Sequence, residues 1–127
     1  VNVHAMPAEL GADVAANIYR EVIRSIETFD IAFLGMGEDG HTASLFPGNK
    51  ALTDLRSVVP VFDAPKEPKE RVSLGLTTLK RAETKLILAC GASKAEMLIR
   101  IKSGEKFPVN SIGDIDWFVD QIAVNEA

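Results

Sequence analysis

The sequence predicts an α/β fold with a mainly parallel sheet and flanking helices. Two short apolar runs, at residues 31–34 and 85–90, are each bounded by turn-forming residues. That pattern is typical of buried strands in a parallel sheet. Stretches with helical periodicity precede the first run and follow the second, at residues 8–28 and 93–102. Strands that alternate with helices in this way favour an α/β architecture.

Composition limits the classes of protein to which the chain can belong. With 127 residues it makes one domain, residues 1–127, which is small for a complete α/β enzyme, so we expect a partial domain. A formal charge of -4 lacks the basic surplus of a nucleic-acid-binding protein. No apolar run approaches the roughly 20 residues of a membrane-spanning helix. Cys90 is the only cysteine; its apolar run predicts a buried thiol, and the lack of an internal pair fits the cytoplasm.

The first helix is predicted over residues 8–28, and the strand of residues 31–34 follows it closely. Its apolar residues recur every four positions, which indicates a long amphipathic helix: Leu10, Val14, Ile18, Val22 and Ile26. The strand that follows is apolar at each position, and we expect it to be buried on both faces. Pro47 limits any helix after this strand to about one turn.

The middle of the chain is predicted to hold shorter elements. Residues 49–55 form a turn, and residues 57–62 form an edge strand because Pro60 interrupts the run. Residues 63–70 are a solvated loop that could act as a mobile flap, and residues 71–76 alternate as a strand does. Thr77 or Thr78 is expected to cap a helical turn over residues 79–82.

The last third predicts a strand, a helix and a final strand. After the strand of residues 85–90, Ser93 and Glu96 have the spacing of a capping box, with Ser93 as the N-cap. The helix continues to about Lys102, and Gly104 supplies the residue that commonly ends a helix. Residues 115–119 alternate as a strand does, and residues 120–127 predict no element.

A glycine-rich turn with reactive side chains follows the first strand. Gly35, Gly37 and Gly40 free the backbone there, and the polar residues around them share one loop: Glu38, Asp39, His41, Thr42 and Ser44. Open α/β sheets bind their ligands beyond the carboxyl ends of the strands. We therefore place the functional site in this loop.

One alternative for this loop is a dinucleotide site. Residues 35–40 match Gly-x-Gly-x-x-Gly, and Asp63 lies at about the expected distance downstream. Pro47 cuts off the helix that should hold the pyrophosphate, and Glu38 with Asp39 would repel that anion. These features oppose dinucleotide binding.

Proton transfer fits the loop better. Histidine is the side chain suited to proton transfer near neutral pH, so His41 can act as a general base, while Asp39 two residues earlier could orient its ring. The same residue types also form ordinary turns, so a structural role remains open on spacing alone. Gly-x-Ser-x-Gly is absent, which excludes Ser44 as the nucleophile of a hydrolase elbow. No His, Cys and carboxylate cluster has the spacing of metal ligands.

Lys94 is a candidate phosphate ligand. It lies in the first turn of its predicted helix, where the helix dipole disfavours a cation unless an anion is bound. A solvated lysine explains the position equally well. Arg71 is a weaker candidate for the same phosphate, because an arginine at the start of a strand is usually solvated.

The chain resembles the family of glucosamine-6-phosphate isomerases and 6-phosphogluconolactonases. The resemblance rests on four segments that together cover most of the chain: GMGEDGHTASLFPG at residues 35–48, RVSLGLTTLKRA at 71–82, GASKAEML at 91–98 and DWFVDQIA at 116–123. It implies a Rossmann-like fold and hydrolysis of 6-phosphoglucono-1,5-lactone in the pentose phosphate pathway. The implied partner is this small phosphorylated sugar lactone, and no cofactor or metal is implied.

The resemblance also assigns roles to residues. It implies that His41 activates water, that Asp39 assists it and that Lys94 contacts the substrate phosphate, with Arg71 as a weaker candidate. It places Gly37, Gly40 and Thr42 among the substrate-binding residues.

Two alternatives to the lactonase stay open. Deaminases of this superfamily carry a glutamate five residues after the histidine, where this chain has Phe46. That difference disfavours a deaminase or isomerase. Family members also carry roughly another half-domain before the first helix, with a glycine-rich phosphate loop. Its absence predicts an incomplete sheet and phosphate site, and it keeps a non-catalytic sugar-phosphate-binding module in consideration. The sequence leaves the oligomeric state open.

Overall fold

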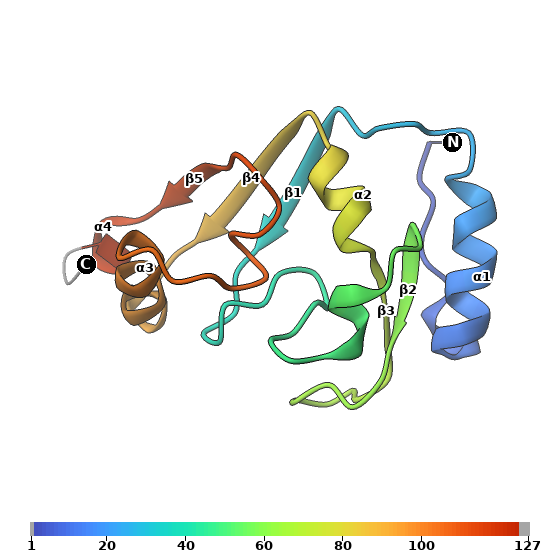
Figure 1. Ribbon diagram of the computed structural model, residues 1–127, viewed down its shortest axis with the longest axis horizontal. Helices are drawn as coiled ribbons and strands as arrows, with labels where there is room; N and C mark the ends of the chain where they lie inside the picture. The colour runs from blue at the N-terminus through green and yellow to red at the C-terminus, as the bar shows by residue number, and fades with distance from the viewer. Residues whose placement is uncertain (1, 125–127) are drawn as a thin grey trace.

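The computed structural model describes residues 2–124 and confirms the α/β fold. Three parallel strands form a sheet in the order β1 (Ile31–Gly35), β4 (Thr84–Ala89), β5 (Asp116–Val119). Phe33 of β1 lies opposite Leu86 of β4, and Leu88 of β4 lies opposite Phe118 of β5. The carboxyl ends of β1 and β4 therefore meet at one edge of the sheet, as Figure 1 shows.

A second, antiparallel pair of strands lies apart from the parallel sheet. It consists of β2 (Val58–Val61) and β3 (Arg71–Leu74), and α1 (Ala12–Val22) packs against it. Helix α2 (Leu76–Arg81) lies between this pair and the sheet (Figure 1). At the opposite end of the molecule, α3 (Ala95–Lys102) and α4 (Gln121–Val124) lie beside the end of β4. Short 3₁₀ turns complete the fold: η1 (Ala8–Leu10), η2 (Lys50–Thr53) and η3 (Ala92–Lys94).

The main core lies between one face of the parallel sheet and the segments that follow β1. Its largest fully buried side chains include Leu45, Leu79, Ile87 and Ile112. Leu45 comes from the segment just after His41, so the core holds that segment against the sheet. The packing of this cluster therefore fixes where the polar loop lies.

The first helix is shorter than predicted, and its apolar stripe faces outward. Gly11 has a φ of 91°, which no helix can continue through, so η1 and α1 are separate. The face of α1 that packs inward is made of small residues, Ala12, Ala15 and Ala16. Small side chains let the helix lie close to β2 and β3, and the predicted stripe stays partly exposed: Leu10, Val14, Ile18, Val22 and Ile26.

The sheet also has one uncovered face. The prediction that the strand at residues 31–34 is buried on both faces is wrong, because the residues of β1 alternate between exposed and half-buried, and Phe33 is 77% exposed. Exposed apolar side chains on this face are Ile31, Phe33, Leu88 and Phe118. A continuous apolar run indicated the strand correctly, but it could not show which of its faces this chain covers.

The predicted N-terminal helix caps are wrong, whereas Gly104 follows the end of α3 with a φ of 101°, as expected. Ser93 does not cap its helix; a 3₁₀ turn that begins after Gly91 leads into α3, and Lys94 precedes the first α-helical residue. Thr77 and Thr78 do not cap α2 and instead donate to the carbonyls of Leu55 and Ser57. These hydroxyls are used to hold α2 against the chain before β2.

Other details differ at the ends of elements. Cys90 is exposed rather than buried, because it follows the last residue of β4 at the alternate position, in phase with the exposed Leu88 and not with the buried Ile87 and Ala89. Residues 121–124 form α4, where no element was predicted. The predicted strands near residues 57–62, 71–76 and 115–119 are confirmed with shorter bounds. No helix among residues 2–124 is long and apolar enough to cross a bilayer.

Candidate active site

The loop after β1 folds into a closed turn. The amide of Gly40 donates to the carbonyl of Gly37 over 3.0 Å, and the amide of Gly37 donates to the carbonyl of His41 over 2.9 Å. Gly40 has a φ of 83°, and its carbonyl accepts a hydrogen bond of 3.0 Å from the amide of Val109. The turn is therefore fixed by its own backbone and by a second loop.

His41 and Asp39 form a hydrogen-bonded pair. His41 Nδ1 lies 2.6 Å from Asp39 Oδ1, and the same oxygen accepts from the His41 amide over 3.1 Å. The two side chains are 25% and 43% exposed respectively, so both are reachable from solvent. Partial burial opposes ionisation of Asp39, but the hydrogen bonds from His41 prevail and hold the pKa of the carboxyl below its ordinary value. An ionised Asp39 thus orients the imidazole ring.

Gly37 leaves the space that the His41 ring occupies. A Cβ at residue 37 would lie 2.0 Å from His41 Nδ1 and 2.1 Å from its Cε1. No side chain fits there unless the ring moves. The predicted site residue Gly37 therefore has a clear structural role, which is to let the backbone approach the imidazole.

Phe46 packs against the other side of the imidazole. The two ring centroids are 4.4 Å apart at an angle of 38°, and Phe46 is 2% exposed. This buried ring supports His41 from the core. Phe46 occupies the position at which the resemblance implies a glutamate in the deaminases.

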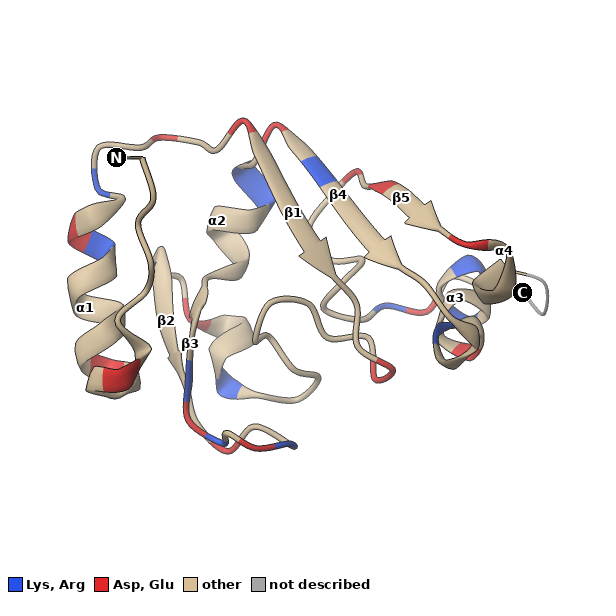
Figure 2. Cartoon of the chain, turned by 180° about the vertical axis from the view of Figure 1, so that it is seen from behind, with Lys and Arg blue, Asp and Glu red and all other residues tan. Residues whose placement is uncertain are grey.

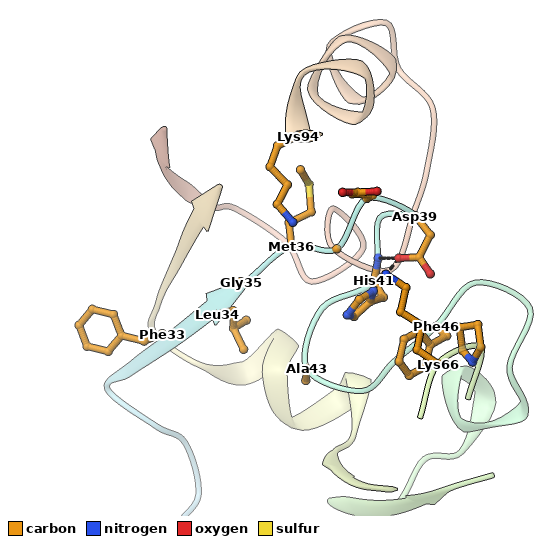
Figure 3. Close-up of a pocket in the computed structure, with 13 residues that line it drawn as sticks. Phe33, Leu34, Gly35, Met36, Asp39, His41, Ala43, Phe46, Lys66 and Lys94 are labelled. Atoms are coloured by element: carbon orange, nitrogen blue, oxygen red, sulfur yellow. Dashed lines mark hydrogen bonds and ion pairs between the residues drawn. The ribbon is translucent and has the colours of Figure 1, made fainter. Parts of the chain in front are cut away.

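These groups line a cavity of about 780 Å³. Its walls come from the end of β1, the turn with Asp39 and His41, Phe46, the loop between β2 and β3, and Lys94. Figure 3 shows Lys94 extending from the start of α3 toward the end of β1, and the Asp39–His41 pair beside it. The structure thus brings together four predicted site residues: Gly37, Asp39, His41 and Lys94.

Lys94 is positioned by a contact that the sequence analysis missed. Asp120 Oδ1 accepts from the amide of Gly91 over 3.0 Å and from that of Ala123 over 2.9 Å. These two hydrogen bonds lower the pKa of the Asp120 carboxyl. Asp120 therefore joins the start of α4 to the turn that carries Lys94. Aspartate followed by a short apolar segment is a capping signal that could have indicated this.

Three predicted residues do not line the cavity. Gly40 closes the turn through the hydrogen bond of its amide to the carbonyl of Gly37. Thr42 is buried, and its hydroxyl donates to the carbonyl of Gly35 over 2.8 Å, which ties the loop to β1. The Arg71 guanidinium contacts backbone carbonyls of the loop before it and lies over the Phe46 ring, with Cζ 5.1 Å from the ring centroid. The substrate-binding roles of these residues stay predictions.

Lys66 is a cavity residue that sequence reasoning did not single out. It lies in the loop of residues 63–70 and lines the cavity with Pro65. Its sequence surroundings, which alternate lysine, proline and glutamate, indicate only a solvated loop. Its place depends on how that loop folds back, which no local pattern encodes.

The remaining alternatives can be compared with this geometry. The Gly-x-Gly-x-x-Gly segment closes on itself, and a short bridge between Thr42 and Leu45 follows it in place of a helix. A dinucleotide site needs the amino end of a helix at that point. Within residues 2–124, no group of three His, Cys, Asp or Glu side chains could hold a metal ion.

A family match agrees with this arrangement. A sequence model described as "Glucosamine-6-phosphate isomerases/6-phosphogluconolactonase" matches residues 1–117. The chain belongs to this family. The matched residues include every residue that lines the cavity, together with the whole of β1 and β4.

Individual family members show how much of a relative the chain represents. A 6-phosphogluconolactonase of Bos taurus is 39% identical over 94% of the chain and 50% of its own length. The crystal structure of a 6-phosphogluconolactonase from Thermotoga maritima is 32% identical, with a TM-score of 0.83 over 93% of the chain and 56% of its own. The chain thus spans about half the length of these family members.

A solved structure of lower sequence identity shows a likeness in fold alone. A monomeric glucosamine-6-phosphate deaminase superposes with a TM-score of 0.73 at 22% identity. The fold by itself therefore does not separate the two activities.

Among the named relatives are a chloroplastic 6-phosphogluconolactonase of Arabidopsis thaliana and an endoplasmic bifunctional protein of Oryctolagus cuniculus.

Proposed function

We propose that the chain carries the catalytic part of a 6-phosphogluconolactonase, which hydrolyses 6-phospho-D-glucono-1,5-lactone to 6-phosphogluconate. The observation that supports this most is the Asp39–His41 pair, whose nitrogen and oxygen are 2.6 Å apart beside a cavity that also holds Lys94. Hydrolysis of a phosphorylated ester needs a general base to activate water and a cation to bind the phosphate, and this cavity offers both.

In this proposal, His41 acts as the general base. Because Asp39 accepts at Nδ1, we assign the proton of neutral His41 to that nitrogen, which leaves the lone pair of Nε2 free. Nε2 takes a proton from water as the water oxygen adds to the lactone carbonyl carbon. The ring ester bond then breaks, and its oxygen takes that proton from Nε2. The acid formed loses its own proton to solvent.

Lys94 binds the substrate phosphate in this proposal. Its ammonium lines the cavity, and it belongs to the turn that opens α3, where backbone amides also favour an anion. Gly37, Gly40 and Thr42 shape the loop beneath the sugar. The catalytic pair and the phosphate ligand thus come from the ends of two adjacent parallel strands.

Deamination is the runner-up, and Phe46 disfavours it. Ring opening and isomerisation of an amino sugar need additional proton transfers near the histidine. Phe46 fills the relevant position with a buried aromatic ring, which carries no exchangeable proton. A strained lactone needs mainly an oriented water. A non-catalytic sugar-phosphate-binding module is the alternative from another class.

The partners and the compartment follow from the same proposal. We propose a small phosphorylated sugar lactone as the substrate, with no nucleic acid or membrane partner. We keep the cytoplasm as the proposed compartment, because the single cysteine requires no oxidising environment.

The test is hydrolysis of freshly made 6-phosphogluconolactone, with the spontaneous rate subtracted. The chain is assayed by itself and mixed with the half of the bovine relative that lies outside the match. His41→Gln should lower kcat by about 10²- to 10⁴-fold, because general-base catalysis contributes about that much. Lys94→Met should chiefly raise KM for the phosphorylated substrate.

Each outcome decides between the candidates. Turnover that depends on His41 supports the lactonase. Turnover that is unchanged in His41→Gln contradicts the general-base role. Binding of 6-phosphogluconate without turnover in either sample favours the binding module, and ammonia release from glucosamine 6-phosphate would favour the deaminase.

A further inference from the structure

We propose that Lys66 is a second anion-binding residue of the cavity, that it serves the carbonyl end of the substrate, and that Arg71 positions it. This rests on the proposed lactone hydrolysis. Lys66 would stabilise the negative charge that develops on the carbonyl oxygen and that remains on the carboxylate of the product. Lys94 would hold the phosphate at the other end.

The placement of the two lysines supports this division. Lys66 and Lys94 both line the cavity, and they come from elements far apart in the sequence. In the view of Figure 3, Lys94 descends from the start of α3, and Lys66 rises from its loop on the opposite side of His41. The product carries one anionic group at each end, and a cation at each end of the cavity complements it.

The loop that carries Lys66 is closed by its own backbone. The amide of Ala64 donates to the carbonyl of Lys69 over 3.0 Å, which folds residues 64–69 into a compact connection between β2 and β3. Figure 2 shows that basic and acidic residues both lie along this loop. Among them, Lys66 is the charged residue that lines the cavity.

Arg71 holds this loop from the start of β3. Its Nε donates to the carbonyl of Pro68 over 2.9 Å, and its Nη2 donates to the carbonyl of Lys66 over 3.2 Å. The same guanidinium lies over the buried ring of Phe46, which supports His41. Arg71 thus connects the backbone of Lys66 to the Phe46 ring, on which His41 packs. These contacts explain why an arginine occupies this position even if it does not touch the substrate.

A planar guanidinium is required for this arrangement. It donates in two directions while it stacks on an aromatic ring, whereas the ammonium of a lysine is a compact point charge. Arg71→Lys keeps the positive charge but removes the planar guanidinium, whose N–H groups donate in two directions. This substitution therefore separates a positioning role from a role as a phosphate ligand.

Equilibrium binding of two ligands tests the division of roles. One ligand is 6-phosphogluconate, which carries phosphate and carboxylate, and the other is glucose 6-phosphate, which lacks the carboxylate. Lys66→Met should weaken 6-phosphogluconate binding by about five- to tenfold and leave glucose 6-phosphate binding unchanged, since one exposed charge contact contributes about that much. Lys69→Met, in the same loop and with the same loss of charge, is the control and should change neither.

The arginine is tested by a double-mutant cycle. Arg71→Lys should weaken 6-phosphogluconate binding nearly as much as Lys66→Met, with glucose 6-phosphate unaffected. The double variant should be no weaker than Lys66→Met alone, because Arg71 acts through Lys66. Without ligand, Arg71→Lys should speed hydrogen exchange at the amide of Ala64.

Several results would overturn the inference. One is a Lys66→Met variant that binds 6-phosphogluconate as Lys69→Met does. Another is an equal loss for both ligands, which would make Lys66 a phosphate ligand. Full retention of affinity in Arg71→Lys would remove the positioning role. Turnover plays no part in these measurements, so failure of the proposed lactonase activity remains a separate result.

Discussion

At the scale of single residues, the site depends on how closely backbone and side chains approach. His41 is held on one side by Asp39, on another by Phe46, and its ring uses the space that a side chain at residue 37 would fill. The sequence indicated His41 and Asp39 as candidates because the chemistry of these residue types can be inferred without the fold. It could not identify Lys66, whose role depends on a fold-back of its loop.

We predict that Gly37→Ala displaces the His41 ring. The added Cβ would lie 2.0 Å from Nδ1, so the ring must leave Asp39. Turnover should fall by roughly 10²-fold, which is typical when a catalytic group moves by about 1 Å. NMR of the ring protons measures the displacement directly.

Gly35→Ala is the matched control for this substitution. A Cβ at residue 35 meets no atom within 4 Å, so the same added methyl should leave the His41 resonances in place. Equal spectral changes in both variants would contradict the steric explanation.

The Asp39 carboxylate should make stability depend on pH. Its pKa is lower in the folded chain than in the unfolded chain, so protons bind more readily to the unfolded state. The stabilisation from the ionised group is therefore complete well above about pH 4 and is lost as the pH falls through the folded-state pKa.

Urea unfolding of wild type and Asp39→Asn at several pH values measures this effect. The difference in free energy of unfolding should be constant near neutrality and should shrink below about pH 4. Glu38→Gln, the neighbouring residue in the same turn, is the charge-matched control. A difference that grows on acidification would have the wrong sign.

At the scale of elements, the strands and their order along the chain were predictable, whereas their ends were not. Apolar runs identified β1 and β4, because period and composition are local properties. The capping box at Ser93 was wrong, because a 3₁₀ turn from Gly91 replaced it. That turn is held by Asp120, which is 29 residues away. Sequence periodicity cannot reveal such a distant partner.

We predict that Asp120→Ala loosens the turn that carries Lys94. The amides of Gly91 and Ala123 would lose their acceptor, and α4 would lose its cap. Loss of such a cap typically costs about 1 kcal/mol of stability. Binding of glucose 6-phosphate should weaken as well, because Lys94 is less well placed.

Chemical denaturation and calorimetric titration measure the two effects. Asp114→Ala, an exposed residue in the loop before β5, serves as the control. If both variants bind glucose 6-phosphate equally well, Asp120 has no part in placing Lys94.

At the scale of the whole molecule, burial is uneven. One face of the parallel sheet packs on the main core, and the other face leaves Phe33 and Leu88 exposed. The fold class was predictable, since it needs only the alternation of strands and helices. The uncovered face was not predictable, because an apolar run has the same pattern whether or not a partner covers it.

We predict that stability falls much more when a side chain on the buried side of the sheet is replaced than when one on the uncovered face is replaced. Leu45→Ala removes a fully buried side chain and should cost about 2–5 kcal/mol in free energy of unfolding. Phe33→Ser alters a side chain that is 77% exposed and should change stability by less than about 0.5 kcal/mol. Denaturant titration compares the two, and a large loss from Phe33→Ser would show that this face is covered in solution.

The uncovered sheet face and the outward stripe of α1 also bear on how stability varies with temperature. The heat-capacity change of unfolding comes from apolar surface that water newly reaches, and much of that surface is already hydrated here. The heat-capacity change of unfolding should therefore fall below the usual value of about 12–15 cal/mol/K per residue. A small increment flattens the stability curve, so this chain should melt over a broad range on heating and resist denaturation in the cold.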